Sequence, residues 1–369
     1  MSAARGMVAA GHPQTAEVGA QVLREGGNAV DAAVAAVLAS WVCEPLLTGP
    51  GAGGYLLVAG AGETPTLLDF FVAAPGAGAP ALPAAALVPL PVDFGATTQV
   101  FNVGAASCGV PGMAQGLESA ITRWGTVPLE RLVAPAAALA RSGVPLNEPQ
   151  AYVFDLLGAM LVGTPQARAE FAPDGRPLRL GEPFRSPLLA DTIERLGADG
   201  AAPFATGDLA QAMAEHVAEH GGLLNAADPA ACAAIERSPA PASYRGRRIL
   251  TNPPPSAGGV LLALAFDLLE ERATGAAPCA ATLAEVMAEV QALRTPQFVA
   301  GLDEPGFLER FLGDRLGSTT HVSVLDADGR ACSVTCTNGT GSGVVVPGTG
   351  IHLNNIMGEE DLKIGRAHV

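Results

Sequence analysis

The chain has 369 residues, enough for one large domain or two medium ones with a substantial core. Its formal net charge is −15, from 36 acidic and 21 basic residues without any basic run, which argues against a nucleic-acid partner because phosphate binding needs clustered Lys or Arg. Every apolar run is interrupted by Gly, Pro or a charged residue before it reaches the roughly 18 residues of a membrane span, so we predict no membrane partner.

The N-terminal residues lack the charged and apolar regions of a signal peptide. We therefore expect a cytoplasmic protein, or a secreted or periplasmic one if the start codon has been miscalled. The six cysteines are scattered without a CxxC pair, and Cys332 and Cys336 lie about 13 Å apart on one predicted strand, too far for a disulfide. We expect all six to be small buried hydrophobic residues in a reducing compartment.

The N-terminal third predicts two helices followed by a strand pair. Apolar residues at helical spacing predict a helix over 13–25 that ends at Gly26-Gly27. Asn28 is the predicted N-cap of a second helix, which is apolar nearly all round to Val42 and therefore buried on most faces. Two strands, over 55–59 and 67–71, come next, and an Ala/Pro-rich loop or cover segment follows over 73–91.

From 108 to 320 the pattern is mainly helical, with one extended stretch near 248–251. The alternation then changes to period two and predicts a hairpin of 320–326 with 331–337, connected by Ala327-Asp-Gly-Arg330. Pairing these strands around Asp328-Gly329 predicts Thr320 opposite Thr337 and Thr319 opposite Asn338. This register brings a second hydroxyl and a carboxamide beside Thr319.

Thr319 is the strongest candidate nucleophile because cutting the chain before it would create a catalyst. Breaking the Ser318–Thr319 bond gives Thr319 a free α-amine with a pKa of roughly 7.7–8.0, close enough to neutrality to accept the hydroxyl proton. Nucleophile and base then belong to one residue. An ordinary strand containing threonines is the better explanation of this segment when it is taken alone, so the rest of the chain must decide.

Three other patterns contain residues that could form functional sites. Gly49-x-Gly51-x-x-Gly54 matches the dinucleotide fingerprint, but the predicted strand follows it rather than precedes it, which favours a close-packed turn. His216-Val-Ala-Glu219-His220 fits the H-x-x-E-H pattern of zinc peptidases, although an exposed helix produces this pattern by chance. His321 is expected to be a satisfied core or positioning histidine on the face of Thr319.

Several ordered motifs resemble those of the γ-glutamyltransferases, also called γ-glutamyltranspeptidases or glutathione hydrolases. They span nearly the whole chain and are, in order, Met7–Pro13, Gly26–Ala33, Glu44–Gly54, Pro253–Gly259, Thr319–Asp326 and Gly341–Asn355. The resemblance implies an α+β fold, the four-layer αββα sandwich of N-terminal-nucleophile hydrolases, incomplete here at the C-terminus. It also implies a precursor that cuts itself between Ser318 and Thr319 into two subunits that stay associated, without a cofactor or a metal.

By this resemblance, Thr319 forms an acyl-enzyme with the γ-glutamyl group of glutathione or a related compound. Thr337 would orient the nucleophile, and Asn338 would contact the substrate. An acidic residue would hold the substrate α-amine, with Asp361 preferred over Glu359 and Glu360. The expected regions are 1–318 for the large subunit and 319–362 for the start of the small subunit, together forming one intertwined domain.

Three departures from the family pattern qualify these expectations. Phe71 stands where the carboxylate-clamping Arg is expected, which removes a bidentate partner for a substrate carboxylate. The Ser pair and the Gly-Gly oxyanion motif of the small subunit do not occur, so we expect this chain alone to be inactive. Residues 363–369 match one reading frame of a common sequencing adapter, so we expect the natural sequence to differ after Leu362.

Three alternative functions remain open from the residues. One is a different amide acylase of the same fold, such as a β-lactam side-chain acylase. A second is a zinc peptidase that uses His216, Glu219 and His220. The third is a homologue that keeps the fold without catalysis.

Overall fold

The computed structural model describes residues 6–60, 62–78, 85–95, 98–272, 278–293 and 320–358. Its main element is a six-stranded antiparallel sheet in the order β1-β11-β12-β2-β3-β8. Two strands from the end of the chain thus lie between strands from its beginning. The sheet strands are β1 (Gly6–Ala10), β2 (Gly53–Gly60), β3 (Glu63–Phe70), β8 (Ile235–Arg237), β11 (Thr320–Asp326) and β12 (Arg330–Thr337).

Four strand pairs complete the β-structure of the described residues. They are β4 (Val88–Asp93) with β5 (Thr98–Val103), β6 (Val144–Pro145) with β7 (Pro183–Phe184), β9 (Ala240–Tyr244) with β10 (Arg247–Thr251), and β13 (Val345–Val346) with β14 (Ile351–His352).

The described helices lie mostly between β2 and β11 along the chain, as the sequence predicts. They are α1 (Pro13–Arg24), α2 (Ala29–Cys43), α3 (Met113–Trp124), α4 (Leu129–Ser142), α5 (Glu148–Leu156), α6 (Gly158–Leu161), α7 (Pro165–Phe171), α8 (Pro187–Asp199), α9 (Ala202–Ala205), α10 (Asp208–Glu219), α11 (Ala227–Ala231), α12 (Ala257–Glu271) and α13 (Ala280–Ala292), with short 3-10 turns η1 (Ala105–Ser107) and η2 (Ile356–Gly358). Within the described ranges, no helix combines the length and apolar character needed to cross a bilayer.

One face of the six-stranded sheet packs against α1, α2 and α3. Every residue of α2 is buried, which confirms the prediction made from its continuous apolar sequence. Alternate residues of the strands, among them Val322, Val334 and Leu56, are buried on this face. Ala, Val and Leu therefore fill the core, as expected for a chain with few aromatic residues.

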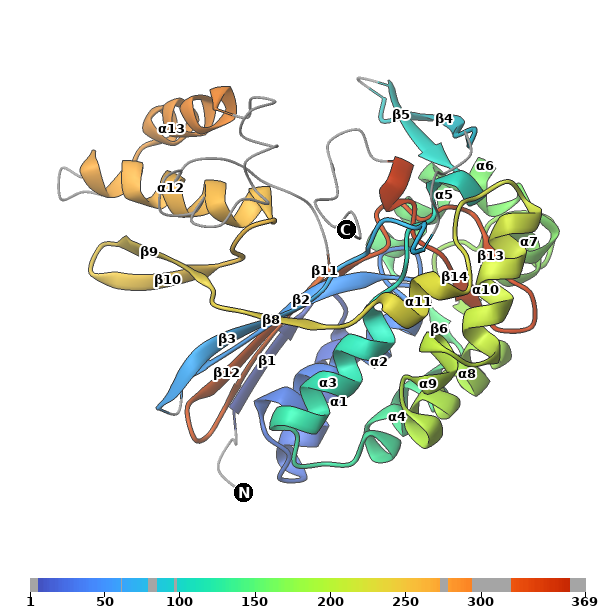
Figure 1. Cartoon of the computed structure of the whole chain (residues 1–369), viewed down its shortest axis with the longest axis horizontal. Helices are drawn as coiled ribbons and strands as arrows, with labels where there is room; N and C mark the ends of the chain where they lie inside the picture. Colours follow the sequence, from blue (N-terminus) through green and yellow to red (C-terminus); the bar gives the residue numbers. More distant parts are fainter. Residues whose placement is uncertain are drawn as a thin grey trace.

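The strand pair β9–β10 lies on the other side of the sheet, with α12 and α13 beyond it (Figure 1). Ala240 and Ala242 of β9 are buried, and β9 and β10 both contact α12. The order of layers is therefore helices, sheet, strand pair, helices. This arrangement agrees with the predicted α+β fold class and with the αββα order of layers.

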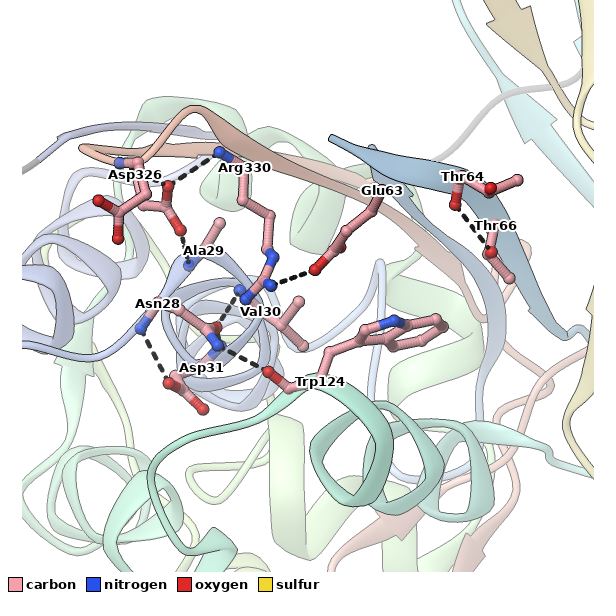
Figure 2. Close-up of polar contacts among 11 residues, drawn as sticks. Asn28, Ala29, Val30, Asp31, Glu63, Thr64, Thr66, Trp124, Asp326 and Arg330 are labelled. Atoms are coloured by element: carbon pink, nitrogen blue, oxygen red, sulfur yellow. Dashed lines mark hydrogen bonds and ion pairs between the residues drawn. The ribbon is translucent and has the colours of Figure 1, made fainter. Parts of the chain in front are cut away.

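The N-terminus of α2 is joined to the β11–β12 hairpin by one buried carboxylate (Figure 2). Asp326 Oδ2 accepts a hydrogen bond from the backbone N–H of Ala29, the first residue of α2, at 3.0 Å. Its Oδ1 accepts from the backbone N–H groups of Asp328 and Arg330 at 3.1 and 2.9 Å. A carboxylate at a helix N-terminus is also favoured by the helix dipole, so Asp326 ties the hairpin to the core helix.

The same helix begins with a capping box. The Asn28 side chain accepts from the N–H groups of Val30 and Asp31, and Asp31 Oδ2 accepts from the N–H of Asn28 at 2.9 Å. Asn28 was the predicted cap, and this prediction is confirmed. Asn28 also donates its amide to the carbonyl of Trp124 at 2.6 Å, which links α2 to the end of α3 (Figure 2).

The predicted register of the C-terminal hairpin was wrong by one residue. Thr320 lies opposite Cys336, not Thr337. The loop has three residues rather than two, and Gly329 has φ 82°, the left-handed conformation that ends a three-residue hairpin loop. The two hydrogen bonds from Asp328 and Arg330 to the Asp326 side chain hold this longer loop. The predicted pairing of Thr319 with Asn338 is not tested, because Thr319 lies outside the described residues.

The predicted burial of the cysteines is confirmed for five of the six. Cys279 is exposed, at the N-cap of α13, and the others are buried. The residues on both sides of Cys279 are mostly Ala, and they form no apolar pattern that predicts whether the cysteine is exposed. None of the six cysteines forms a disulfide.

Candidate functional site

Thr337 is the last residue of β12 and lies opposite Gly53 of β2. Strand alternation directs its side chain to the sheet face away from α2, the face that also carries Thr335 and His321. The side chain is 7% exposed, and its Oγ1 accepts a hydrogen bond from the backbone N–H of Gly339 at 2.8 Å. With the acceptor role fixed in this way, the hydroxyl proton of Thr337 remains available to a neighbouring group on that face.

Asn338 is fully buried directly after this strand. Its backbone N–H donates to the carbonyl of Leu47 at 3.0 Å, and its carbonyl accepts from Gly341 and Asn355, each at 3.1 Å. Neither atom of its carboxamide has a hydrogen-bond partner among the described residues. A buried unpaired amide costs about 1–3 kcal/mol, so this well-anchored group is suited to bind a ligand.

The glycine-rich segment beside Asn338 is a close-packed turn, as predicted. A Cβ atom on Gly51 would lie 2.2 Å from the carbonyl oxygen of His352, and one on Gly54 would lie 2.3 Å from that of Thr335. The segment continues into β2 rather than into a helix. These glycines therefore allow backbones to approach one another, which does not support nucleotide binding.

Asn354 and Asn355 hold the loops around Asn338 together, a role that sequence reasoning missed. Asn354 donates to the carbonyls of Gly51 and Gly109 at 2.9 and 3.0 Å and accepts from the N–H of Gly109. Asn355 donates to the Thr340 hydroxyl at 2.8 Å and accepts from the N–H of Thr340 at 2.9 Å. An Asn pair one residue after the buried strand β14 was the available signal, because buried amides need several partners.

His321 is on the predicted face but is not a core residue. Its Nδ1 lies 2.8 Å from the Thr335 hydroxyl, and its Nε2 lies 2.9 Å from Ser323 and 3.1 Å from Ser333. Partial burial lowers its pKa. These hydroxyl contacts satisfy the ring on an exposed sheet face, which corrects the expectation of a core position.

Phe71 follows β3 and stacks on Tyr55 of β2, with ring centroids 5.4 Å apart and an interplanar angle of 13°. A Cβ atom on Gly53 would lie 2.8 Å from the Phe71 carbonyl carbon. Because Gly53 pairs with Thr337, the aromatic pair lies one strand away from the Thr337 hydroxyl. The position where the family resemblance expects an Arg therefore holds an aromatic pair near the candidate site.

Glu44 is a buried carboxyl on the core side of the same strands, 3% exposed. Burial raises its pKa to about 7, and the nearby Thr15 hydroxyl opposes this shift. Burial, and to a smaller extent the Glu44 charge, raises the pKa of Cys336, which lies opposite Thr320. Glu44 is therefore partly protonated near neutral pH.

Replacing Glu44 with Gln is expected to remove a loss of stability at alkaline pH. A carboxyl whose pKa is raised on folding stabilises the fold below its ordinary pKa, and that stabilisation is lost as the pH rises toward and through about 7. The wild type should lose about 3 kcal/mol relative to Glu44→Gln between pH 4.5 and 8, from about 1.4 kcal/mol per pKa unit. Urea unfolding across this pH range measures the difference, and parallel pH profiles would contradict it. Glu215→Gln, at an exposed position of α10, is the matched control.

Several predicted site residues lie outside the described residues. They are the predicted cleavage pair Ser318 and Thr319 and the acidic candidates Glu359, Glu360 and Asp361. Of the predicted site residues, the structure places Thr337 and Asn338. These two lie next to each other at the start of the loop that Asn355 secures.

The His216-Glu219-His220 pattern lies at the C-terminal end of α10. One ligand atom from each of the three side chains lies within 4.8 Å of the other two. Burial and then the neighbouring His220 lower the pKa of His216, while Glu219 raises it. The three side chains of this pattern therefore lie close together, on a helix outside the six-stranded sheet.

Comparison with known proteins identifies the family. The Gamma-glutamyltranspeptidase family model matches residues 15–303 and 309–366. The Glutathione hydrolase proenzyme of Escherichia coli (strain K12) is 30% identical over 100% of this chain and 69% of its own length. The Acylase ACY 1 proenzyme of Pseudomonas sp. (strain V22) is 31% identical over 98% of this chain and 71% of its own length.

Solved structures agree with the sequence matches. A cephalosporin acylase from Bacillus halodurans superimposes with a TM-score of 0.76 at 28% identity, over 95% of this chain and 69% of that one. A gamma-glutamyltranspeptidase from Pseudomonas nitroreducens complexed with L-DON superimposes with a TM-score of 0.67 at 29% identity, over 85% of this chain and 96% of that one. The chain belongs to the gamma-glutamyltranspeptidase family.

Proposed function

We propose that this protein is an N-terminal-nucleophile amide hydrolase or acyltransferase in which Thr319, freed by cleavage after Ser318, attacks the substrate. The observation that carries the proposal is the site at the ends of β11 and β12. There the Thr337 hydroxyl and the unpaired Asn338 carboxamide directly follow Cys336, the residue that pairs with Thr320 at the start of β11. Continuing the β11–β12 register by one residue would place Thr319 opposite Thr337.

Cleavage and catalysis use the same hydroxyl. In the precursor, Thr319 Oγ adds to the Ser318 carbonyl carbon, the bond to the Thr319 nitrogen breaks, and the nitrogen takes the hydroxyl proton. Water then hydrolyses the resulting ester and leaves Thr319 with a free α-amine. This amine, with a pKa of roughly 7.7–8.0, accepts the hydroxyl proton in each later turnover.

In turnover, Thr319 Oγ attacks the substrate amide carbon and the leaving amine takes the proton from the Thr319 α-amine. The acyl group remains as an ester on Thr319 until water or an acceptor amine removes it. Thr337 orients the nucleophile, and the Asn338 carboxamide binds the substrate. Glu360 or Asp361 is proposed to hold a substrate α-amine.

A γ-glutamyl amide such as glutathione is the first candidate substrate. The name of the Escherichia coli relative, Glutathione hydrolase proenzyme, supports this choice. The test is the mass and activity of the purified full-length gene product. We expect two associated chains, with Thr319 as a new N-terminus, and hydrolysis of γ-glutamyl-p-nitroanilide.

A different acyl amide is the second candidate, and the Phe71–Tyr55 pair favours it. Two stacked rings provide an apolar surface where a guanidinium would bind a carboxylate. The named acylases among the relatives and solved structures support this alternative. It predicts a preference for substrates whose acyl group lacks the α-carboxylate.

Phe71→Arg is therefore expected to shift the enzyme toward γ-glutamyl substrates. A charge-assisted hydrogen bond contributes about 1.5–3 kcal/mol, so the ratio of kcat/KM for γ-glutamyl-p-nitroanilide over 4-aminobutanoyl-p-nitroanilide, which keeps the amine but lacks the carboxylate, should rise about 10- to 100-fold. Phe71→Leu is the matched control, since it removes the ring without adding a charge. An unchanged ratio in Phe71→Arg would argue against a carboxylate-binding role for this position.

A further inference from the structure

The histidine pattern at the end of α10 is not used by the proposed catalytic mechanism. We propose that His216, Glu219 and His220 form a binding site for one divalent transition-metal ion, with zinc as the best match, that braces the end of this helix. The donor set, two imidazoles and one carboxylate, is one that zinc uses in proteins. The site is independent of the proposed amide hydrolysis.

The spacing of the three side chains carries the first part of the argument. His216 and His220 are four residues apart and their rings are neighbours, with centroids 4.4 Å apart. All three ligand atoms lie within 4.8 Å of one another. Ligands of a tetrahedral zinc ion lie about 3.3 Å apart, from bonds of about 2.0–2.1 Å, so modest side-chain rotations bring the three donors onto one ion.

The orientation of His220 carries the second part. Its Nδ1 lies 2.8 Å from the backbone carbonyl oxygen of His216. A carbonyl oxygen only accepts, so Nδ1 carries the proton and Nε2 keeps its lone pair. Metal-binding histidines commonly have this arrangement, because a hydrogen bond from the second nitrogen fixes the tautomer and the ring.

The backbone around the site is well fixed. The Gly222 N–H donates to the Val217 carbonyl at 2.8 Å, and the His220 N–H donates to the same carbonyl at 3.3 Å. A Cβ atom on Gly222 would lie 2.4 Å from the Ala105 carbonyl oxygen, so the turn packs closely on η1. A cation at this point also meets the negative end of the helix dipole. Metal binding would therefore stabilise the C-terminal end of α10.

The test is titration of the purified full-length protein, prepared without a polyhistidine tag and treated with chelator, with zinc chloride in a calorimeter. We expect saturable binding of one zinc ion per chain, lost or weakened at least about tenfold in His220→Ala, since even second-shell changes cost about 10- to 100-fold. Zinc should also raise the Tm of the wild type and not that of His220→Ala.

Three variants make the result specific. Glu219→Gln should also weaken binding, and it guards against a local folding defect in His220→Ala. Glu215→Gln, on the same helix, and Cys279→Ser, which removes the exposed thiol, should bind as the wild type does. Equal binding by wild type and His220→Ala, or no saturable binding by wild type, would overturn the proposed site.

Discussion

Replacing Thr319 with Ala is expected to leave the full-length gene product as a single uncut chain without amide hydrolase activity. The substitution removes the hydroxyl that attacks the Ser318 carbonyl, and without cleavage no α-amine is released to act as the base. Loss of a nucleophile of this kind costs about 10⁴-fold or more in kcat. Intact-mass spectrometry measures cleavage, and a p-nitroanilide assay measures activity.

Thr319→Ser is the matched control, because it keeps the hydroxyl and removes only a methyl group. This variant should still cut itself and retain measurable turnover. A wild-type protein that is fully active as one unbroken chain would contradict the proposed mechanism. Cleavage of the Thr319→Ala variant at the same bond would contradict it as well.

Replacing Asp31 with Ala is expected to lower the free energy of unfolding by about 4 kcal/mol, in the range found when one partner of a buried charged network is removed. The fully buried Asp31 carboxylate accepts four hydrogen bonds. They come from the N–H groups of Asn28, Thr126 and Val127, at 2.9, 2.9 and 3.1 Å, and from the Thr126 hydroxyl at 2.5 Å. The variant leaves these donors unpaired at the start of the most deeply buried described helix.

Urea unfolding of the uncut Thr319→Ala protein measures this effect in a single chain. Asp191→Ala is the matched control, because Asp191 is an exposed carboxylate paired with Arg141 at 2.9 Å. Its removal should change stability by less than about 1 kcal/mol. If both variants lost the same free energy of unfolding, the hydrogen bonds of Asp31 to Thr126 and Val127 would not stabilise the contact between α2 and the segment after α3.

Local sequence patterns predicted the elements that depend on short-range interactions. The first helix was predicted over 13–25 and runs over Pro13–Arg24, and the capping residue Asn28 was identified because a cap acts within one helical turn. The strands 320–326 and 331–337 were identified from their alternation. Strand β1 was not predicted, because five residues without strong alternation become a strand only by pairing with β11.

In the candidate site, too, the sequence predicted individual residues but not the long-range contacts that hold them. Sequence chemistry and family resemblance singled out Thr337 and Asn338, but not the scaffold that positions them. The anchoring of Asn338 depends on Leu47, Gly341 and Asn355, and Leu47 lies almost 300 residues away along the chain. Such contacts carry no local pattern, so they became visible only in three dimensions.

The sequence by itself determined the family, the candidate nucleophile and the buried character of α2, because motif order and apolar patterning are properties of the chain. Only the tertiary structure decided the hairpin register and the strand order. The register depends on three hydrogen bonds to Asp326, one of which comes from Ala29 at the other end of the chain. Long-range pairing of this kind is set by which buried polar groups satisfy one another, and a linear pattern does not record that choice.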